Sequence, residues 1–200
     1  MTPFVLEDKI VRLSAPIIGD IPEIVEWCND PDSMRYMPLP RPYGIEQAKW
    51  YLDNVVVPGW KNDQSLTWAL RDRTSLLKPN GDFPALGTIT IRTSTPERGA
   101  LPGEVGFVAA PAARGKGLMS AALSLVLSWA LSLDGLALPE AHWECVPGNL
   151  GSWRVAWKNG FIFDGIWDGA PGHTLGHWYG HIKAGAPLAP VAPWPAGAPI

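Results

Sequence analysis

The fold is decided by Ala113-Arg114-Gly115-Lys116-Gly117-Leu118-Met119, which joins a short predicted strand to a long predicted helix. Glycine lets the backbone turn tightly and approach a ligand closely, and this stretch holds Gly115 and Gly117. Successive N–H groups in such a turn can converge on one anion. The first turn of the following helix adds unpaired N–H donors and the positive end of the helix dipole. The stretch therefore predicts a phosphate-binding loop.

Two better-known phosphate motifs do not fit this loop. A Walker loop has a glycine five positions before its Gly-Lys pair and a Ser or Thr after it, whereas this chain has Ala110 and Gly117 there. A dinucleotide-binding fingerprint needs a third glycine, and Ser120 stands in its place. It also needs an acidic residue about 20 positions on, which Asp134 fits poorly. Both nucleotide-binding motifs are therefore excluded.

Composition and charge narrow the class of protein. The chain has 200 residues, 46% hydrophobic and 18% charged, which is typical of one globular domain with a substantial core. A formal net charge of −3 gives no reason to expect nucleic acid, which needs a broad basic surface. Cys28 and Cys145 lie far apart without metal-ligand spacing, so both are expected to be reduced thiols in a cytoplasmic protein.

No segment suggests a membrane partner. The charges of Glu7, Asp8 and Lys9 stand where a signal peptide would be apolar. The charge-free run from Leu118 to Leu133 is shorter than the ~20 residues that span a bilayer. We interpret it as a helix buried on most of its sides.

Periodicity and turn residues predict an α/β chain whose helices cover a mixed sheet. The predicted strands are residues 10–13, 66–71, 86–92, 104–108, 141–146, 161–167 and 177–182. The predicted helices are residues 22–29, 45–55, 118–133 and 151–159, the second stopping before Pro58-Gly59. Three prolines make residues 35–43 irregular, and the Ala, Gly and Pro from Ala184 onward predict an extended, weakly held tail.

A second motif follows the loop, Asn149-x-x-Ser152-x-Arg154-Val155-x-x-Lys158-x-Gly160-Phe161. Together the two motifs resemble the GNAT superfamily of acyl-CoA-dependent N-acetyltransferases, and within it the RimJ/RimL-like branch, whose founding members acetylate ribosomal-protein N-termini. The resemblance runs from about Ile10 to Ile182. It implies a mixed, mostly antiparallel central sheet flanked by helices and splayed between the family's strands 4 and 5. The domain would occupy residues 1–183, followed by a Pro/Ala/Gly-rich tail over residues 184–200.

The resemblance implies that acetyl-CoA (coenzyme A) is the cofactor. In the family, the loop after the fourth strand binds the pyrophosphate through backbone N–H groups. The matching residues here are Arg114, Gly115, Lys116, Gly117, Leu118 and Met119. The fourth strand of the family pairs its free edge with the pantetheine arm, and an N–H near Val108 would polarise the thioester carbonyl. That edge matches Phe107, Val108 and Ala109.

Asn149 and Ser152 match family positions that contact the pantetheine and the sulfur. Alternatively, Asn149 only caps the helix that follows it, and the two roles are compatible. Many family members carry a tyrosine general acid where this chain has Ala156, and the RimJ/RimL-like branch commonly lacks it. A serine matching Ser152 has been assigned a related role there, although a hydroxyl is a weak acid. The alternative for Ser152 is positioning of the cofactor.

Glu104 is the candidate general base, because it matches an acidic position on the family's fourth strand. An amine must lose a proton before it attacks, and a carboxylate with a raised pKa can take it, often through a water. The alternative is an exposed strand residue. The resemblance implies direct transfer from thioester to amine without a covalent enzyme intermediate.

Several other residues have both a functional and a structural interpretation. Trp27, Tyr36, Tyr43 and Trp50 could shape an acceptor pocket, although core packing explains them as well. Glu23, Glu26, Asp30 and Asp32 could attract a cationic acceptor or form a solvated helix face. Glycines between His173, His177 and His181 argue for loop and strand, so no metal site is predicted.

The sequence therefore predicts a cytoplasmic N-acetyltransferase that moves an acetyl group to a primary amine on a protein N-terminus or a small molecule. Its partner is that amine-bearing acceptor, and the protein is a monomer or homodimer. Three alternatives stay open. They are a catalytically silent acyl-CoA-binding protein, an antibiotic- or polyamine-modifying acetyltransferase, and an interaction protein working through its tail.

Overall fold

The computed structural model describes residues 1–93, 103–167 and 176–195. These residues form an eight-stranded sheet in the order β1-β2-β3-β4-β5-β6-β8-β7, with only the β5–β6 pair parallel. The mixed, mostly antiparallel sheet was predicted and is confirmed. Its strands are β1 (Leu6–Glu7), β2 (Val11–Ser14), β3 (Ser65–Asp72), β4 (Ala85–Arg92), β5 (Glu104–Ala109), β6 (Glu140–Cys145), β7 (Ile162–Trp167) and β8 (His177–Lys183).

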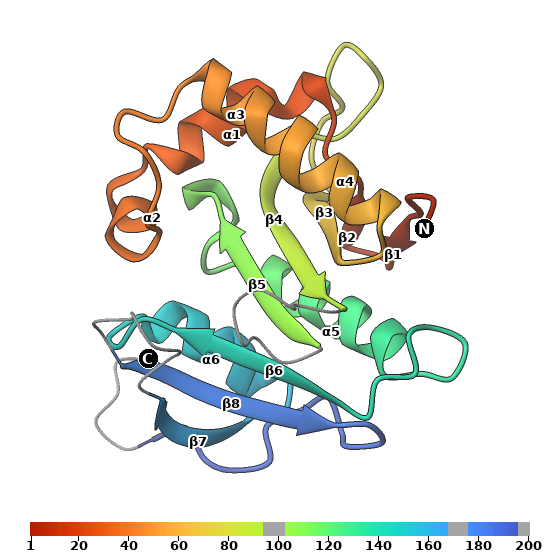
Figure 1. The fold of residues 1–200 in the computed structure, drawn as a ribbon, viewed down its shortest axis with the longest axis vertical. Helices are drawn as coiled ribbons and strands as arrows, with labels where there is room; N and C mark the ends of the chain where they lie inside the picture. The colour runs from red at the N-terminus through yellow and green to blue at the C-terminus, as the bar shows by residue number, and fades with distance from the viewer. Residues whose placement is uncertain (94–102, 168–175, 196–200) are drawn as a thin grey trace.

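Helices cover both faces of this sheet. Figure 1 shows α1, α3 and α4 on one side of β2 to β4 and α5 on the other, and α6 packs against α5 and β6. Because both faces are covered, β3 is buried along nearly its whole length. The helical segments are α1 (Ile21–Cys28), α2 (Pro31–Tyr36), α3 (Ile45–Tyr51), α4 (Val57–Lys61), α5 (Leu118–Ala130) and α6 (Leu150–Lys158), with shorter turns η1 (Ile18–Asp20), η2 (Leu52–Val56) and η3 (Pro111–Ala113).

Helix α5 begins where it was predicted and ends earlier. Its buried side chains recur at helical spacing, and they are Leu118, Met119, Ala122, Leu123, Val126, Leu127 and Ala130. The chain leaves the helix after Ala130, and the Leu133 side chain is 93% exposed. A turn in which Gly135 N–H donates to Ser132 O ends the helix there, which absence of charge alone did not predict.

Two predictions about the N-terminal helices need correction. The irregular segment predicted over residues 35–43 is confirmed for residues 37–43, but Arg35 and Tyr36 belong to α2, with the Asp30 carboxylate accepting from Ser33 N–H at 3.0 Å as its cap. The helix over 45–55 was predicted to stop before Pro58. Instead it continues through the π-turn η2 into α4, because Val57 N–H donates to Leu52 O and Pro58 falls in the first turn of α4.

Strands β5 and β6 pair only at one end. The pairs are Glu104↔His142 and Val105↔Trp143, and His142 N–H donates to Gly103 O at 3.0 Å. Beyond them the two strands diverge, as Figure 1 shows. They correspond to the family's fourth and fifth strands, because β1 is an additional strand of two residues. The predicted splay is therefore confirmed.

The tail is held more firmly than its composition predicted. Trp157 Nε1 donates to Ala192 O at 2.8 Å, and the Trp194 ring lies 5.1 Å from that of Trp153. The Arg154 guanidinium lies 5.4 Å from the same Trp194 ring. The expectation of a weakly held tail is therefore wrong for residues 184–195, and residues 196–200 lie outside the described part. Trp194, one aromatic residue among Ala, Gly and Pro, is the anchor.

Candidate active site and cofactor cleft

The loop from Arg114 to Met119 follows β5 and η3 at the wide end of the splay. Gly115 and Gly117 have φ values of +73° and +77°, in the left-handed region that favours glycine. Arg114 N–H donates to Pro111 O at 3.2 Å. The N–H groups from Gly115 to Met119 donate to no other atom of the described chain. They form a row of unpaired donors at the start of α5, which is what an anion needs.

The side chains of this loop divide into two kinds. Leu118 and Met119 are buried in the core, so only their backbones are available to a ligand. Lys116 is exposed and makes no ion pair within the described residues. Arg114 is committed elsewhere, because its guanidinium donates to Asp30 Oδ2 at 2.6 Å and to Asp32 Oδ2 at 3.2 Å. The positive side chain that the loop offers to a phosphate is therefore Lys116.

Pairing register decides which amides of β5 face the splay. Thr88 pairs with Val108, and Ala110 N–H donates to Leu86 O at 2.9 Å. Donors alternate along an antiparallel strand, so the Val108 N–H faces β4. The N–H groups of Phe107 and Ala109 face β6, whose pairing with β5 ends at Val105. The amides near Val108 that point into the splay are thus its two neighbours.

Asn149 and Ser152 lie together at the start of α6. Asn149 Oδ1 accepts from Ser152 N–H at 3.1 Å, so Asn149 is the helix cap that was weighed as an alternative. Ser152 Oγ accepts from Trp143 Nε1 at 2.9 Å, which leaves its own proton to donate. Cys145 is close by, and burial raises the pKa of its thiol to about 12, although a hydrogen bond with Ser152 lowers it. Ala156 is fully buried and offers no acid.

Glu104 occupies the closed end of the splay. Its side chain is 12% exposed, and Oε1 accepts from Arg92 Nη1 at 2.5 Å. Burial raises the pKa of Glu104 above its ordinary value, and the charge of Glu144 raises it further, whereas Arg92 and His177 oppose the shift. The alternative of an exposed strand residue is therefore wrong. A buried carboxylate with a raised pKa is suited to accept a proton near neutral pH.

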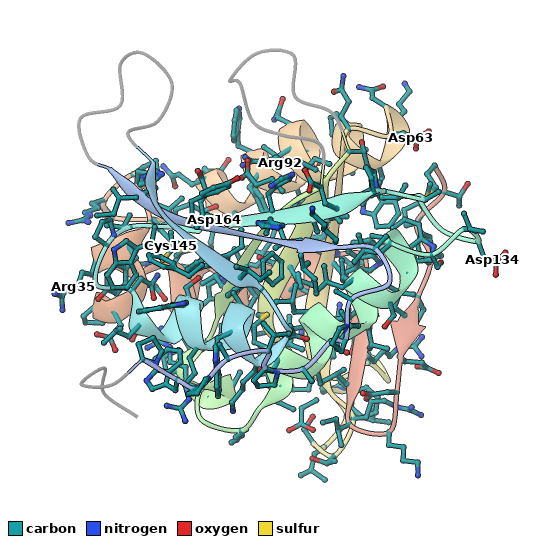
Figure 2. The ribbon with its side chains drawn as sticks, turned by 90° about the horizontal axis from the view of Figure 1, so that it is seen from below. Arg35, Asp63, Arg92, Asp134, Cys145 and Asp164 are labelled. Atoms are coloured by element: carbon teal, nitrogen blue, oxygen red, sulfur yellow. The ribbon has the colours of Figure 1, made fainter. Side chains whose placement is uncertain are left out.

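Sequence reasoning missed the groups that tune Glu104. Arg92 ends β4, and Glu144 and His177 lie on β6 and β8 with His177 Nδ1 3.6 Å from Glu144 Oε2. In Figure 2, Arg92 and Cys145 mark two parts of this region, the partner of Glu104 and the last residue of β6. The sequence offered one signal for Arg92, because β4 and β5 are consecutive strands and pair antiparallel. Their register places Arg92 opposite Glu104.

The histidines are engaged with carboxylates. His181 Nδ1 lies 2.6 Å from Asp164 Oδ2, and His142 Nε2 lies 3.3 Å from Glu140 Oε1. His173 lies outside the described residues. Among those that are described, no group of three or more His, Cys, Asp or Glu residues is arranged to hold a metal ion.

Comparison with protein families identifies the chain. The profile of the acetyltransferase (GNAT) domain matches residues 11–162, which is most of its length. The chain belongs to the GNAT acetyltransferase family. The predictions of this family, of an N-acetyltransferase and of acetyl-CoA as its cofactor are thereby confirmed. A search of curated proteins finds no significant match.

Solved structures share the GNAT fold over nearly the whole chain. RimL, a ribosomal L7/L12 α-N-protein acetyltransferase in complex with coenzyme A, has a TM-score of 0.69 at 13% identity, covering 90% of this chain and 98% of its own. RimJ from Mycobacterium smegmatis has a TM-score of 0.68 at 18% identity, covering 91% of this chain and 87% of its own. The microcin C7 self-immunity acetyltransferase MccE, in complex with acetyl-CoA and AMP, has a TM-score of 0.70 at 14% identity, covering 88% of this chain and 93% of its own. In the described part of this chain, no helix is long and apolar enough to cross a membrane.

Proposed function

We propose that this GNAT enzyme transfers an acetyl group directly from acetyl-CoA to the N-terminal amine of a peptide or protein in the cytoplasm. The observation that carries the proposal is the row of unpaired N–H donors from Gly115 to Met119, aligned with a splay that has Glu104 at its closed end. Acetyl-CoA supplies an activated thioester. The residues present fit it, because the loop offers donors to a diphosphate and the splay offers the free edge of β5.

Each part of the site has a proposed role. The loop amides and Lys116 hold the pyrophosphate, and the amides of Phe107 and Ala109 face the pantetheine and the thioester oxygen. Glu104 takes the proton of the acceptor amine through a water. The C–N bond forms as the C–S bond breaks, and the departing sulfur receives a hydrogen bond from Ser152. Asn149 orders this end of α6 as its cap and offers its amide N–H groups to the pantetheine.

The acceptor is proposed from the activities of the similar proteins. RimL acts on a protein α-amine, and this supports a peptide N-terminus as the acceptor here. A small-molecule amine, such as an antibiotic or a polyamine, is the second candidate, supported by the likeness to the self-immunity enzyme MccE. We propose no nucleic-acid partner, since the net charge is −3. The catalytic unit is proposed to be a monomer or a homodimer.

Glu104→Gln tests the proposal. It removes the base but keeps the shape, so kcat at neutral pH should fall ~10²-fold or more, while the Kd for acetyl-CoA from calorimetry stays unchanged. Glu7→Gln, which alters a surface partner of Arg12, is the matched control and should leave both values unchanged. Thiol release is measured against a panel of peptides, polyamines and aminoglycosides.

Three outcomes separate the alternatives. Release of thiol with peptides supports the proposal, and release only with small amines supports the second candidate. Binding of acetyl-CoA without any release supports a silent binder. Full turnover by the Glu104→Gln enzyme would remove Glu104 from the mechanism.

A further inference from the structure

We propose that Arg114 is a positioning residue whose guanidinium fixes α2 as a wall across the wide end of the splay, and that it does not bind the pyrophosphate. The inference rests on the proposed function in one respect, that the acceptor amine reaches the thioester between β5 and β6. An arginine in a phosphate loop would ordinarily be assigned to the phosphate. The contacts of this side chain argue otherwise.

Each of the three guanidinium nitrogens of Arg114 donates to a protein acceptor. Besides Asp30 and Asp32, the guanidinium donates from Nη2 to Ser33 Oγ at 3.0 Å and from Nε to Ala109 O at 3.2 Å. One side chain thus joins the last residue of β5 to the cap and first turn of α2. A guanidinium spreads five N–H donors over three nitrogens and can reach these four acceptors, whereas an ammonium group has only three donors on one nitrogen.

The charge of Arg114 is also neutralised where it stands. Burial by itself would raise the pKa of Asp30, but the hydrogen bond and charge of Arg114, together with the Ser33 N–H, lower it below its ordinary value. Asp30 is therefore a carboxylate, and a second carboxylate, Asp32, lies 3.2 Å from Nη1. A phosphate that approached Arg114 would have to compete with both carboxylates and would be repelled by them.

The other end of α2 reaches the opposite arm of the splay. Tyr36 donates its hydroxyl proton to Gly148 O at 3.1 Å, one residue before the α6 cap Asn149. Helix α2 is therefore anchored to the loop after β5 by Arg114 and to the loop after β6 by Tyr36. Figure 1 shows α2 beside the ends of both strands, which agrees with these two contacts. An acceptor that enters between β5 and β6 would meet this helix.

Two variants, Arg114→Gln and Asp30→Asn, distinguish positioning from phosphate binding. If Arg114 were a phosphate ligand, Arg114→Gln would weaken acetyl-CoA binding, whereas Asp30→Asn would tighten it because it removes a competitor for Arg114. If Arg114 positions α2, Asp30→Asn should instead have the same effects as Arg114→Gln. We expect both variants to lower kcat/KM for the acceptor ~10-fold, to leave the Kd for acetyl-CoA within ~2-fold, and to combine less than additively.

Hydrogen exchange of residues 32–36 gives a readout that does not depend on activity. In the substrate-free protein we expect both variants to speed this exchange ~10-fold, whereas Arg12→Gln, which breaks the surface pair with Glu7, leaves it unchanged. Arg114→Lys guards against misfolding of the glutamine variant. It keeps the charge but loses the fork, so a positioning role predicts faster exchange with acetyl-CoA affinity retained.

The inference is overturned if Asp30→Asn tightens acetyl-CoA binding, or if Arg114→Gln weakens it ~10-fold with exchange of α2 unchanged. Its failure differs from failure of the proposed function. If the wild-type protein shows no acetyl transfer but α2 exchanges faster in both variants, the proposed function is refuted and the positioning role of Arg114 is supported. An active wild-type enzyme with unchanged exchange in both variants refutes this inference alone.

Discussion

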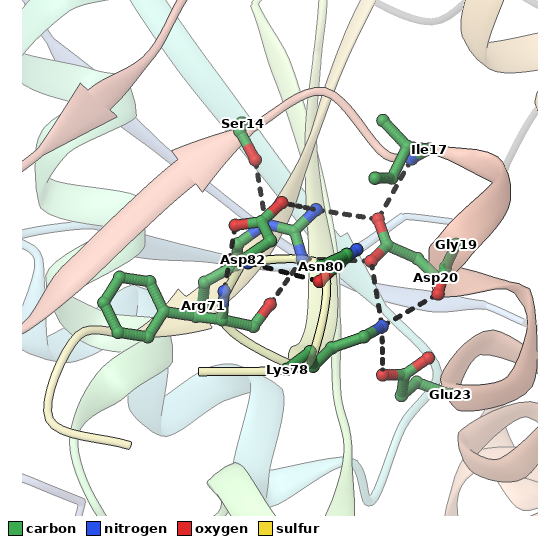
Figure 3. Close-up of polar contacts among 10 residues, drawn as sticks. Ser14, Ile17, Gly19, Asp20, Glu23, Arg71, Lys78, Asn80 and Asp82 are labelled. Carbon is green, nitrogen blue, oxygen red and sulfur yellow. Dashed lines mark hydrogen bonds and ion pairs between the residues drawn. The ribbon is translucent and has the colours of Figure 1, made fainter. Parts of the chain in front are cut away.

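Two arginines of the described residues bind aspartates, and their surroundings differ. Arg71 is completely buried and donates to both oxygens of Asp20, at 3.0 and 2.7 Å, and its other acceptors are Ser14 Oγ and Phe83 O (Figure 3). Arg114 is 34% exposed and stands beside a row of unpaired amides. In the first region each donor has a partner and water is excluded. In the second, the backbone N–H groups of the loop and the Lys116 ammonium have no partner among the described residues and are open to a ligand.

The buried region is a support for the fold. Lys78 Nζ donates to Glu23 Oε1 at 2.6 Å and to Gly19 O at 2.8 Å, so η1 and the start of α1 are tied to the turn between β3 and β4 (Figure 3). That turn closes through Lys78 N–H to Asp82 O at 2.7 Å, as its Pro-Asn-Gly sequence predicted. A cluster of charged side chains therefore does not by itself indicate a functional site. Hydrogen-bond donors without a protein partner, such as the loop N–H groups, are the better indicator.

The largest effect is expected when a substitution breaks the buried ion pair between Arg71 and Asp20. Arg71→Met should lower the free energy of unfolding by about 3–5 kcal/mol, because it removes the bidentate partner of the buried Asp20 and leaves it only the Ile17 N–H and the more distant Lys78 ammonium. Arg12→Met, which breaks the exposed pair with Glu7, should cost about 0–1 kcal/mol. Urea unfolding followed by tryptophan fluorescence measures both values. Equal losses in the two variants would mean that the buried pair contributes no more than a surface contact.

The next effect concerns the ion pair at the closed end of the cleft. The base must be deprotonated, so kcat/KM should rise with pH through the pKa of Glu104, which lies above the ordinary value for glutamate. Arg92 lowers that pKa, so Arg92→Gln should move the acid limb to higher pH. Glu144 raises it, so Glu144→Gln should move the limb to lower pH.

The two shifts are measured from pH profiles of kcat/KM at fixed ionic strength. Shifts of one sign in both variants would show that the limb belongs to another group. The limb should vanish from the residual activity of Glu104→Gln, and its persistence there would exclude Glu104 as the titrating base.

A smaller effect compares two glycines, one from each region. Gly115 and Gly81 have φ values of +73° and +82°, and an added Cβ would meet no protein atom within 4 Å at either position. Each alanine variant should therefore lose about 1–2 kcal/mol of stability from the left-handed backbone alone. Gly115→Ala should in addition weaken acetyl-CoA several-fold, whereas Gly81→Ala should not. Calorimetry and urea unfolding separate the two terms, and equal acetyl-CoA affinity in both variants would place the diphosphate elsewhere.

Much of the fold could be predicted from the sequence because its signals are local. The alternation in residues 86–92, the turn at 78–82 and the glycines of the loop depend on neighbours along the chain, and each of them was predicted correctly. The path through Pro58 could not be predicted in this way, because the wider turn η2 accommodates the proline. The packing of Trp194 against α6 is a contact between distant segments.

The site was predictable in its backbone and less so in its side chains. The loop and the capping Asn149 follow from motifs in one stretch of chain. The carboxylate partners of Arg114 are more than 80 residues away, and the charged neighbours of Glu104 come from three other strands. Side-chain electrostatics depend on which strands become neighbours, so the commitment of Arg114 to α2 needed the structure.

The smallest expected effect concerns two thiols, Cys28 at the end of α1 and Cys145 at the end of β6 in the cleft. Burial raises the pKa of both Cys28 and Cys145 to about 12, so at pH 8 only ~1 thiol in 10⁴ is a thiolate. Neither should be alkylated by iodoacetamide in the native protein, and both should react in urea. Incubation with acetyl-CoA alone should give no acetyl adduct by intact-mass measurement, since direct transfer uses no enzyme nucleophile. An adduct on Cys145 would instead indicate a covalent intermediate beside Ser152, and the cleft would then hold a nucleophile that the buried region lacks.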